Sequence, residues 1–153
     1  MTDTLSKRRL KLWIRLLRTT RLAESDLREF LRVEHDSTLP RFDVMAALHR
    51  SDSELTMTEL SRMLLVSNSN ATAVVDRLVK AGLVVRRASE SDRRIVKVAL
   101  TGEGRRHFAE LAAGHEARVD ALFADVSSSD LDALDELLHH IDPRKGITYG
   151  PDG

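Results

Sequence analysis

Residues 67–84, SNSNATAVVDRLVKAGLV, constrain the fold more than any other stretch, because they specify a helix together with both of its ends. The Ser67 hydroxyl can cap the first turn by accepting a hydrogen bond from the backbone N–H of Ser69 or Asn70. Gly82 suits the left-handed position that ends many helices. Between these ends, apolar residues recur at helical spacing, at Val74, Val75, Leu78 and Val79. The stretch therefore predicts a short helix with a cluster of small polar side chains at its N-terminal end.

Two β-rich runs follow this helix, LVVRR at 83–87 and IVKVAL at 95–100, and the segment ASESDRR between them predicts a hairpin. A shorter helix is expected just before residue 67, with Thr58 as its cap. Its buried side is expected to hold Leu60, Met63 and Leu64. Two short helices joined by a tight turn and followed by a hairpin form the winged helix-turn-helix arrangement.

Further helices are predicted on both sides of this region. Residues 5–34 indicate a long amphipathic helix, whose apolar residues at helical spacing are Leu10, Trp13, Ile14, Leu17, Leu27, Phe30 and Leu31. A second helix is expected after Ser37 and Thr38, with Pro40 in its first turn. Its buried side is expected to hold Phe42, Met45, Ala46 and Leu48.

Two helices are expected after the hairpin. Thr101 can cap the first, over about residues 102–124, and Ser127–Ser129 interrupt it. The second carries Leu131, Leu134, Leu137, Leu138 and Ile141 and ends at Asp142–Pro143. We therefore expect a mainly α-helical fold with a small β-hairpin wing, in four parts. These are an N-terminal helix over residues 1–35, a winged helix-turn-helix domain over 36–101, C-terminal helices over 102–142 and a flexible tail over 143–153.

The charge of the chain is unevenly distributed, although its formal net charge is zero. Residues 80–106 hold eight Lys and Arg against three Asp and Glu, whereas residues 107–142 hold one against nine. A concentrated basic segment within a neutral protein indicates a surface that binds a polyanion.

Composition excludes several other classes of protein. The chain has no cysteine, so it has no disulfide framework and no thiolate nucleophile. No apolar run approaches the roughly 20 residues of a membrane span, and the N-terminus lacks the apolar core of a signal peptide. No P-loop, Gly-x-Gly-x-x-Gly, His-Glu-x-x-His or Ser-centred elbow is present. We therefore expect a cytoplasmic, non-enzymatic protein without a cofactor.

The polar end of the 67–84 helix has the residue types that bind DNA bases and phosphates. A recognition helix contacts the major groove with its N-terminal residues. Asparagine can pair with adenine through two hydrogen bonds, and Ser and Thr can bind bases or phosphates. The candidates are Ser67, Asn68, Ser69, Asn70 and Thr72. A plain capping cluster on a solvated helix remains the alternative for this end taken alone.

The predicted hairpin adds a second set of basic candidates. Asp92 can accept a fork of hydrogen bonds from Arg94 and hold its guanidinium in place. An arginine held in this way suits the narrow, electronegative minor groove. Arg93 lies beside it at the tip, and Arg86, Arg87 and Lys97 on the strands could reach phosphates. A charged, solvated hairpin is the alternative.

These segments together resemble the MarR family of bacterial transcription regulators over about residues 37–108. The matching segments are TMTELSRMLLVSNSNATAVVDRLVKAGLVVR, the Asp-x-Arg of the wing at Asp92–Arg94, and KVALTGEGRRHF. The resemblance implies a homodimer that binds a palindromic operator in double-stranded DNA, with N- and C-terminal helices forming the dimer interface. It also implies that Arg77 lies on the recognition helix and Arg94 at the wing tip. Many members have a basic residue where this chain has Ala73, so base recognition here is expected to depend on Asn68, Asn70 and Thr72.

Dimerisation is also supported by geometry and composition. Two half-sites about 34–36 Å apart require a two-fold symmetric protein. The long first helix and the last two helices carry more apolar surface than one small lobe can cover. An ordinary helical core within one chain is the alternative.

The family resemblance also implies an effector, usually a small aromatic anion that releases DNA. Candidate contacts are Trp13, Arg15, Leu17, Phe42, Met45, His49 and His115. Ordinary core packing is the alternative for the apolar residues, and a surface or core position without a ligand is the alternative for the two histidines. The segments LPRFDVMAAL and ELSRMLLVSNSN are similar to members that respond to hydroxycinnamoyl-coenzyme A and related aromatic acyl thioesters. Arg15, Arg18 and Arg21 could then bind coenzyme A phosphates, and a solvated helix face is the alternative that their pattern favours. The expected function is therefore a repressor of an aromatic-compound catabolic operon.

Alternatives for the regulated process and for the partner stay open. A metal-responsive or efflux-controlling regulator of the same fold is one alternative. The candidate metal ligands are His107, Glu110, His115 and Glu116, but these residues spread over two turns of one helix. His139 and His140 are adjacent on another helix and point in different directions. We expect no metal site. A winged-helix module that binds RNA or another protein is a further alternative, and salt-dependent binding to duplex DNA would distinguish it.

Overall fold

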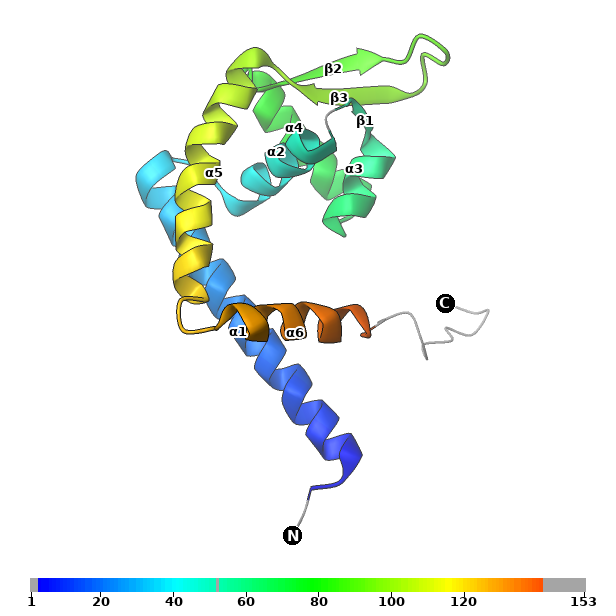
Figure 1. Ribbon diagram of the computed structural model, residues 1–153. Helices are drawn as coiled ribbons and strands as arrows, with labels where there is room; N and C mark the ends of the chain where they lie inside the picture. The colour runs from blue at the N-terminus through cyan, green and yellow to red at the C-terminus, as the bar shows by residue number, and fades with distance from the viewer. Residues whose placement is uncertain (1–2, 52, 142–153) are drawn as a thin grey trace, which may run out of the picture. The chain divides into compact units, whose positions relative to one another are not determined.

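The computed structural model describes residues 3–51 and 53–141 of the chain. The chain divides into two compact units, residues 1–119 and 120–153. The described helices are α1 (Leu5–His35), α2 (Leu39–Ser51), α3 (Met57–Leu64), α4 (Asn68–Lys80), α5 (Gly102–Leu122) and α6 (Ser128–His139). The described strands are β1 (Leu55–Thr56), β2 (Val84–Ala88) and β3 (Val96–Leu100). The fold is therefore mainly α-helical with a small antiparallel sheet, as expected (Figure 1).

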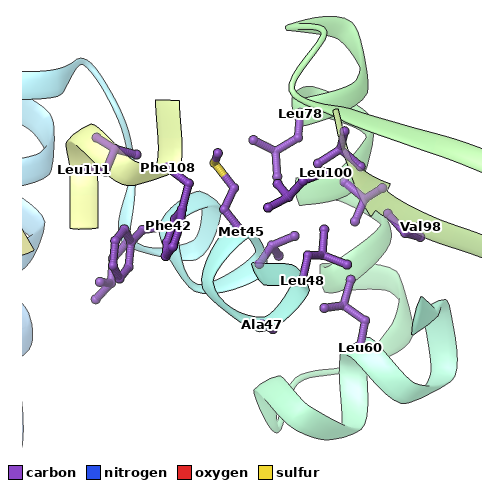
Figure 2. Packing of buried hydrophobic residues seen from close by; sticks show 14 of the residues in the cluster. Phe42, Met45, Ala47, Leu48, Leu60, Leu78, Val98, Leu100, Phe108 and Leu111 are labelled. Carbon is purple, nitrogen blue, oxygen red and sulfur yellow. The ribbon is translucent and has the colours of Figure 1, made fainter. Parts of the chain in front are cut away.

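Helix α2 provides the centre of the core of the first unit. Its buried side chains include Phe42, Met45 and Leu48. They pack between Phe108 and Leu111 of α5 on one side and α3, α4 and β3 on the other (Figure 2). The residues contributed by those three elements include Leu60, Leu78, Val98 and Leu100. This core holds the two short helices and the hairpin together.

The sheet has the strand order β1-β3-β2, with both pairs antiparallel. Strand β1 was not predicted from the sequence; its Leu55 and Thr56 pair with Val98 and Lys97 of β3. Two residues are too few to show the alternation that identifies a strand. Strands β2 and β3 form the predicted hairpin, with Val84 opposite Leu100 and Ala88 opposite Val96.

The prediction for α3 was wrong at two residues. Thr56, not Thr58, caps the helix: its Oγ1 accepts from the Glu59 N–H at 3.2 Å, and Glu59 Oε2 accepts from the Thr56 N–H at 2.8 Å. This reciprocal pair is a capping box, and it lowers the pKa of Glu59. Met63 is 46% exposed, because the inward face follows Met57, Leu60, Ser61 and Leu64.

Helix α4 has both predicted ends. The Asn70 N–H donates to Ser67 Oγ at 3.3 Å. Gly82 has φ +73°, and the Leu83 and Gly82 N–H groups donate to the carbonyls of Leu78 and Val79, each at 3.0 Å. These two bonds form a Schellman motif. Ala71, Val75 and Leu78 are buried, while Val74 and Val79 pack partly buried against the core.

Only the C-terminal part of α1 is buried in the first unit. Leu27, Phe30 and Leu31 are its buried residues. Arg118 of α5 pairs with Asp26 at 3.1 Å and Glu34 at 3.2 Å, and its guanidinium lies 5.0 Å from the centroid of the Phe30 ring. Residues 5–26 include no buried side chain, and several of their large apolar residues are exposed, among them Leu10, Trp13, Ile14 and Leu22.

Helix α5 begins at its predicted cap, and α6 begins at Ser127, which was predicted only as part of the break between the two helices. Thr101 Oγ1 accepts from the Gly104 N–H at 2.9 Å, and Ser127 Oγ accepts from the Asp130 N–H at 3.2 Å. No α6 side chain is buried. The predicted stop at Asp142–Pro143 and the tail over 143–153 lie outside the described residues. Within residues 3–51 and 53–141, no helix has the length and apolarity to cross a membrane.

Candidate nucleic-acid interface

The N-terminal end of α4 presents its small polar residues to solvent. Ser67, Asn68, Ser69 and Asn70 are exposed, and Thr72 is half-buried. The Ser67 and Ser69 hydroxyls lie 3.1 Å apart and can share a hydrogen bond. The exposed N–H groups of this helix end favour a phosphate or another anion.

The two asparagines of this end differ in their surroundings. The side-chain oxygen of Asn68 is hydrogen-bonded to the hydroxyl of Ser61, a buried residue of α3. One end of the Asn68 amide is therefore used within the helix-turn-helix. Pairing with adenine through two hydrogen bonds requires both ends of the amide. Asn70 has no side-chain hydrogen bond within the described residues, so its amide is available at both ends.

Arg77 and Ala73 extend this surface along α4. Both are exposed. With Asn70 they line a cavity of about 360 Å³ between α2 and α4, whose wall includes the apolar side chains Val44 and Val74. The solvent-facing side of α4 therefore combines polar groups with a shallow apolar hollow.

The wing tip carries an exposed, partly fixed arginine. Arg94 is 93% exposed in its side chain. Asp92 Oδ1 accepts from the Arg94 backbone N–H at 2.9 Å and from its Nε at 3.4 Å. The predicted contact between Asp92 and Arg94 is present, but its fork geometry is not: one carboxylate oxygen accepts from both the backbone N–H and Nε. The Asp92 carbonyl accepts from the Ile95 N–H at 2.9 Å, which closes the turn, and Arg93 beside it is exposed.

The two arginines of β2 lie on opposite faces of the sheet. Arg86 pairs with Val98 and shares its face with Val84 and Leu100, which are buried. Its guanidinium forms an ion pair with Asp76 and donates to the Thr72 carbonyl at 3.5 Å, both on α4. The predicted phosphate contact by Arg86 is not supported, because its side chain is turned to the helix.

Arg87 faces the other side of the hairpin. It lies opposite Lys97 and pairs with Glu54 at 3.3 Å. Its side chain is two-thirds exposed. Of the two β2 arginines, Arg87 is the one whose guanidinium solvent or a phosphate can reach.

The predicted effector residues fall into two separate groups. The rings of Phe42 and His115 stack at 4.2 Å between centroids, and those of His49 and Phe108 lie 4.8 Å apart. Met45 is 1% exposed and belongs to the core. The remaining three, Trp13, Arg15 and Leu17, lie on the part of α1 without buried side chains.

A cavity of about 470 Å³ adjoins the stacked rings. Its lining includes Phe42, His115, Phe108, Arg50 and Asp43. Burial lowers the pKa of His115, which favours its neutral ring. Burial and the charge of Glu24 raise the pKa of Asp43, while Arg50 opposes this shift.

Phe108 and Arg50 are two of the six lining residues of this cavity that were not predicted as effector contacts. Phe108 precedes His115 by seven residues on α5, and this two-turn spacing could have revealed it. Arg50 is in the last turn of α2 and gave no signal in the sequence. In the described part of the chain, no three His, Asp or Glu residues lie together as a metal site would require.

Comparisons with known proteins agree with this geometry. A model of the MarR family matches residues 35–95. The HTH-type transcriptional regulator MhqR of Bacillus subtilis is 25% identical over 138 residues, which cover 90% of this chain and 93% of that protein.

Two crystal structures have the same fold. A MarR family transcriptional regulator from Silicibacter pomeroyi is 31% identical, with a TM-score of 0.74 over 90% of this chain and 95% of that one. A mutant of MarR from E. coli, complexed with operator DNA, is 25% identical, with a TM-score of 0.77 over 90% of this chain and 97% of that one.

Proposed function

This chain belongs to the MarR family of transcriptional regulators, and from this premise we propose how it regulates. It binds a palindromic operator as a homodimer and represses an aromatic-compound catabolic operon. It releases the operator when a small aromatic acid, or the coenzyme A thioester of one, binds.

One observation supports the DNA-binding mode: the first unit exposes two different sets of side chains that can contact DNA, one on α4 and one on the wing. The polar end of α4 presents Asn70 and its neighbours, and the β2–β3 wing presents Arg94. A helix N-terminus with small polar groups suits the major groove, and an exposed arginine suits the narrow minor groove. Ser67, Ser69, Arg77, Arg87 and Arg93 are expected to contact phosphates around these two sites.

The effector proposal is supported by the cavity between α2 and α5. Phe42, Phe108 and His115 offer ring faces for stacking, and Arg50 offers a guanidinium for a carboxylate. The Arg50 guanidinium and the aromatic rings therefore suit an aromatic acid.

The test of the DNA-binding mode is a gel shift on DNA from upstream of the chain's own gene. Arg94→Ala is expected to weaken binding by about 1–3 kcal/mol, the usual scale of one specific contact. Arg105→Ala is the control, because it removes the same charge from an exposed position of α5 outside the proposed surface. If Arg94→Ala bound as tightly as the control, the wing would have no part in operator recognition.

The effector is tested in the same assay by adding aromatic acids and their thioesters. Release of the operator is expected at concentrations that leave the Arg50→Gln variant bound. If no aromatic acid or thioester released the wild-type protein, the effector proposal would be wrong, while the DNA-binding mode would stand.

A further inference from the structure

Arg86 differs from the other basic residues of the wing in the direction of its side chain. Strand register places it on the inner face of the sheet, beside buried Val84 and opposite buried Val98. Only 32% of its side chain is exposed, against 66% for Arg87 and 93% for Arg94. Its position on the strand thus points it at α4 rather than at solvent.

The contacts of Arg86 form a clamp across one turn of α4. One guanidinium nitrogen pairs with the Asp76 carboxylate, and the other donates to the Thr72 carbonyl at 3.5 Å. Residues four apart lie on the same face of a helix. The planar guanidinium therefore holds β2 to α4 at two points, which a lysine ammonium could not do with the same geometry.

The clamp adds a tether beyond those at the base of the hairpin. At the base, the Thr101 N–H donates to the Leu83 carbonyl at 3.0 Å, and the Thr101 hydroxyl donates to the Gly82 carbonyl at 2.7 Å. Arg86 acts farther along β2, two residues before the strand ends at Ala88. It therefore fixes the part of the hairpin that leads to the tip.

We propose that Arg86 is a positioning residue: through Asp76 and Thr72 it sets the placement of the wing relative to α4, and it does not contact DNA. The proposal rests on the proposed function, in which α4 and Arg94 occupy different grooves of the same duplex. Two linked contacts add to affinity only where the link lets both form together. Loosening the clamp should therefore weaken operator binding without removing any DNA contact.

Whether Asp76→Asn strengthens or weakens operator binding distinguishes the positioning role of Arg86 from a phosphate contact by Arg86. If Arg86 bound phosphate, removing the Asp76 charge would release it towards DNA and strengthen binding. If Arg86 is a clamp, Asp76→Asn should weaken operator binding by about 2- to 30-fold, the range of coupling effects away from a ligand. Arg86→Met should weaken operator binding to a similar extent. The double variant of Asp76→Asn and Arg86→Met should lose no more affinity than the single variant with the larger loss.

The salt dependence of binding gives a second, independent measurement. Each phosphate contact contributes about 0.9 to the slope of log affinity against log salt concentration. Fluorescence anisotropy on operator DNA should give the same slope for Arg86→Met as for the wild-type chain. A slope smaller by about one, or tighter binding by Asp76→Asn, would overturn the proposal.

A double-variant measurement with Arg94 distinguishes the positioning role of Arg86 from a loss of affinity caused by general destabilisation of the fold. In the Arg86→Met background, Arg94→Ala should cost less affinity than it does in the wild type, because the wing is no longer held in place. Additive losses would contradict the positioning role. If the wild-type chain did not bind duplex DNA at all, the proposed function itself would fail, and that outcome differs from each of these.

Discussion

At the scale of single residues, the partner of a side chain decides what it is available to do. Asn68 and Asn70 are the same residue type on the same helix end, and the sequence offered no reason to distinguish them. The structure distinguishes them through Ser61, which is seven residues before Asn68 and bonded to its amide oxygen. The residue types of the candidate interface were predictable, whereas their partners depended on how α3 meets α4.

Asn70→Ala is therefore expected to change base preference at one position in each half-site. A bidentate asparagine–adenine pair contributes about 1–3 kcal/mol of discrimination, and only Asn70 has its whole amide available for one. Selection of binding sites from random DNA should return a motif that is degenerate at that position.

Asn68→Ala is the matched comparison. It should keep the wild-type motif and lower the melting temperature instead, because Ser61 loses a partner. If the two variants selected the same altered motif, the difference drawn from Ser61 would be wrong.

At the scale of elements, local sequence signals predicted the helix ends well. The features that these signals missed depend on tertiary contacts. Ser67, Gly82 and Thr101 are caps that need only their own neighbours, and all three were predicted correctly. The cap of α3 was misplaced from Thr56 to Thr58, because Thr56 also ends β1 and that strand forms only by pairing with β3. Likewise, the clamp between Arg86 and Asp76 joins residues ten apart whose contact follows from the hairpin folding back on α4.

The packing of α1 against α5 depends on a glycine that helix propensity alone would disfavour. A Cβ on Gly114 would overlap the ring of Phe30, which is buried, so that the ring or the helix would have to shift. Gly114→Ala gains about 1 kcal/mol of helix propensity, but overpacking a core position costs about 1–3 kcal/mol. We expect a net loss of stability, measured as a lower midpoint in urea unfolding.

Gly102→Ala is the control for this prediction, since a Cβ there meets nothing within 4 Å and the residue lies in the first turn of the same helix. Its midpoint should be equal to or above that of the wild type. Equal midpoints for Gly114→Ala and Gly102→Ala would show that α1 and α5 pack less closely in solution.

At the scale of the whole molecule, the chain exposes more apolar surface than a monomer needs. Helix α6 has no buried residue, and Leu131, Leu134, Leu137, Leu138 and Ile141 are all exposed. Leu10, Trp13 and Ile14 of α1 are exposed as well. Large exposed apolar patches mark interaction surfaces, and the proposed operator has two half-sites. The proposed homodimer would account for both features by covering these residues with a second copy of the chain.

Leu137→Arg is the sharpest test of this interface, because Leu137 is 61% exposed and its replacement cannot disturb a core. Burying a charge in an apolar interface costs far more than the leucine contributed, so the dimer should dissociate at micromolar concentration. Sedimentation velocity should show a dimer for the wild type and a monomer for Leu137→Arg, with weaker operator binding to match. Glu136→Arg introduces the same side chain at the neighbouring position, which the helical period places opposite the leucines, and it should remain dimeric. A wild-type chain that sediments as a monomer while binding its operator would instead assign the apolar faces of α1 and α6 to another partner.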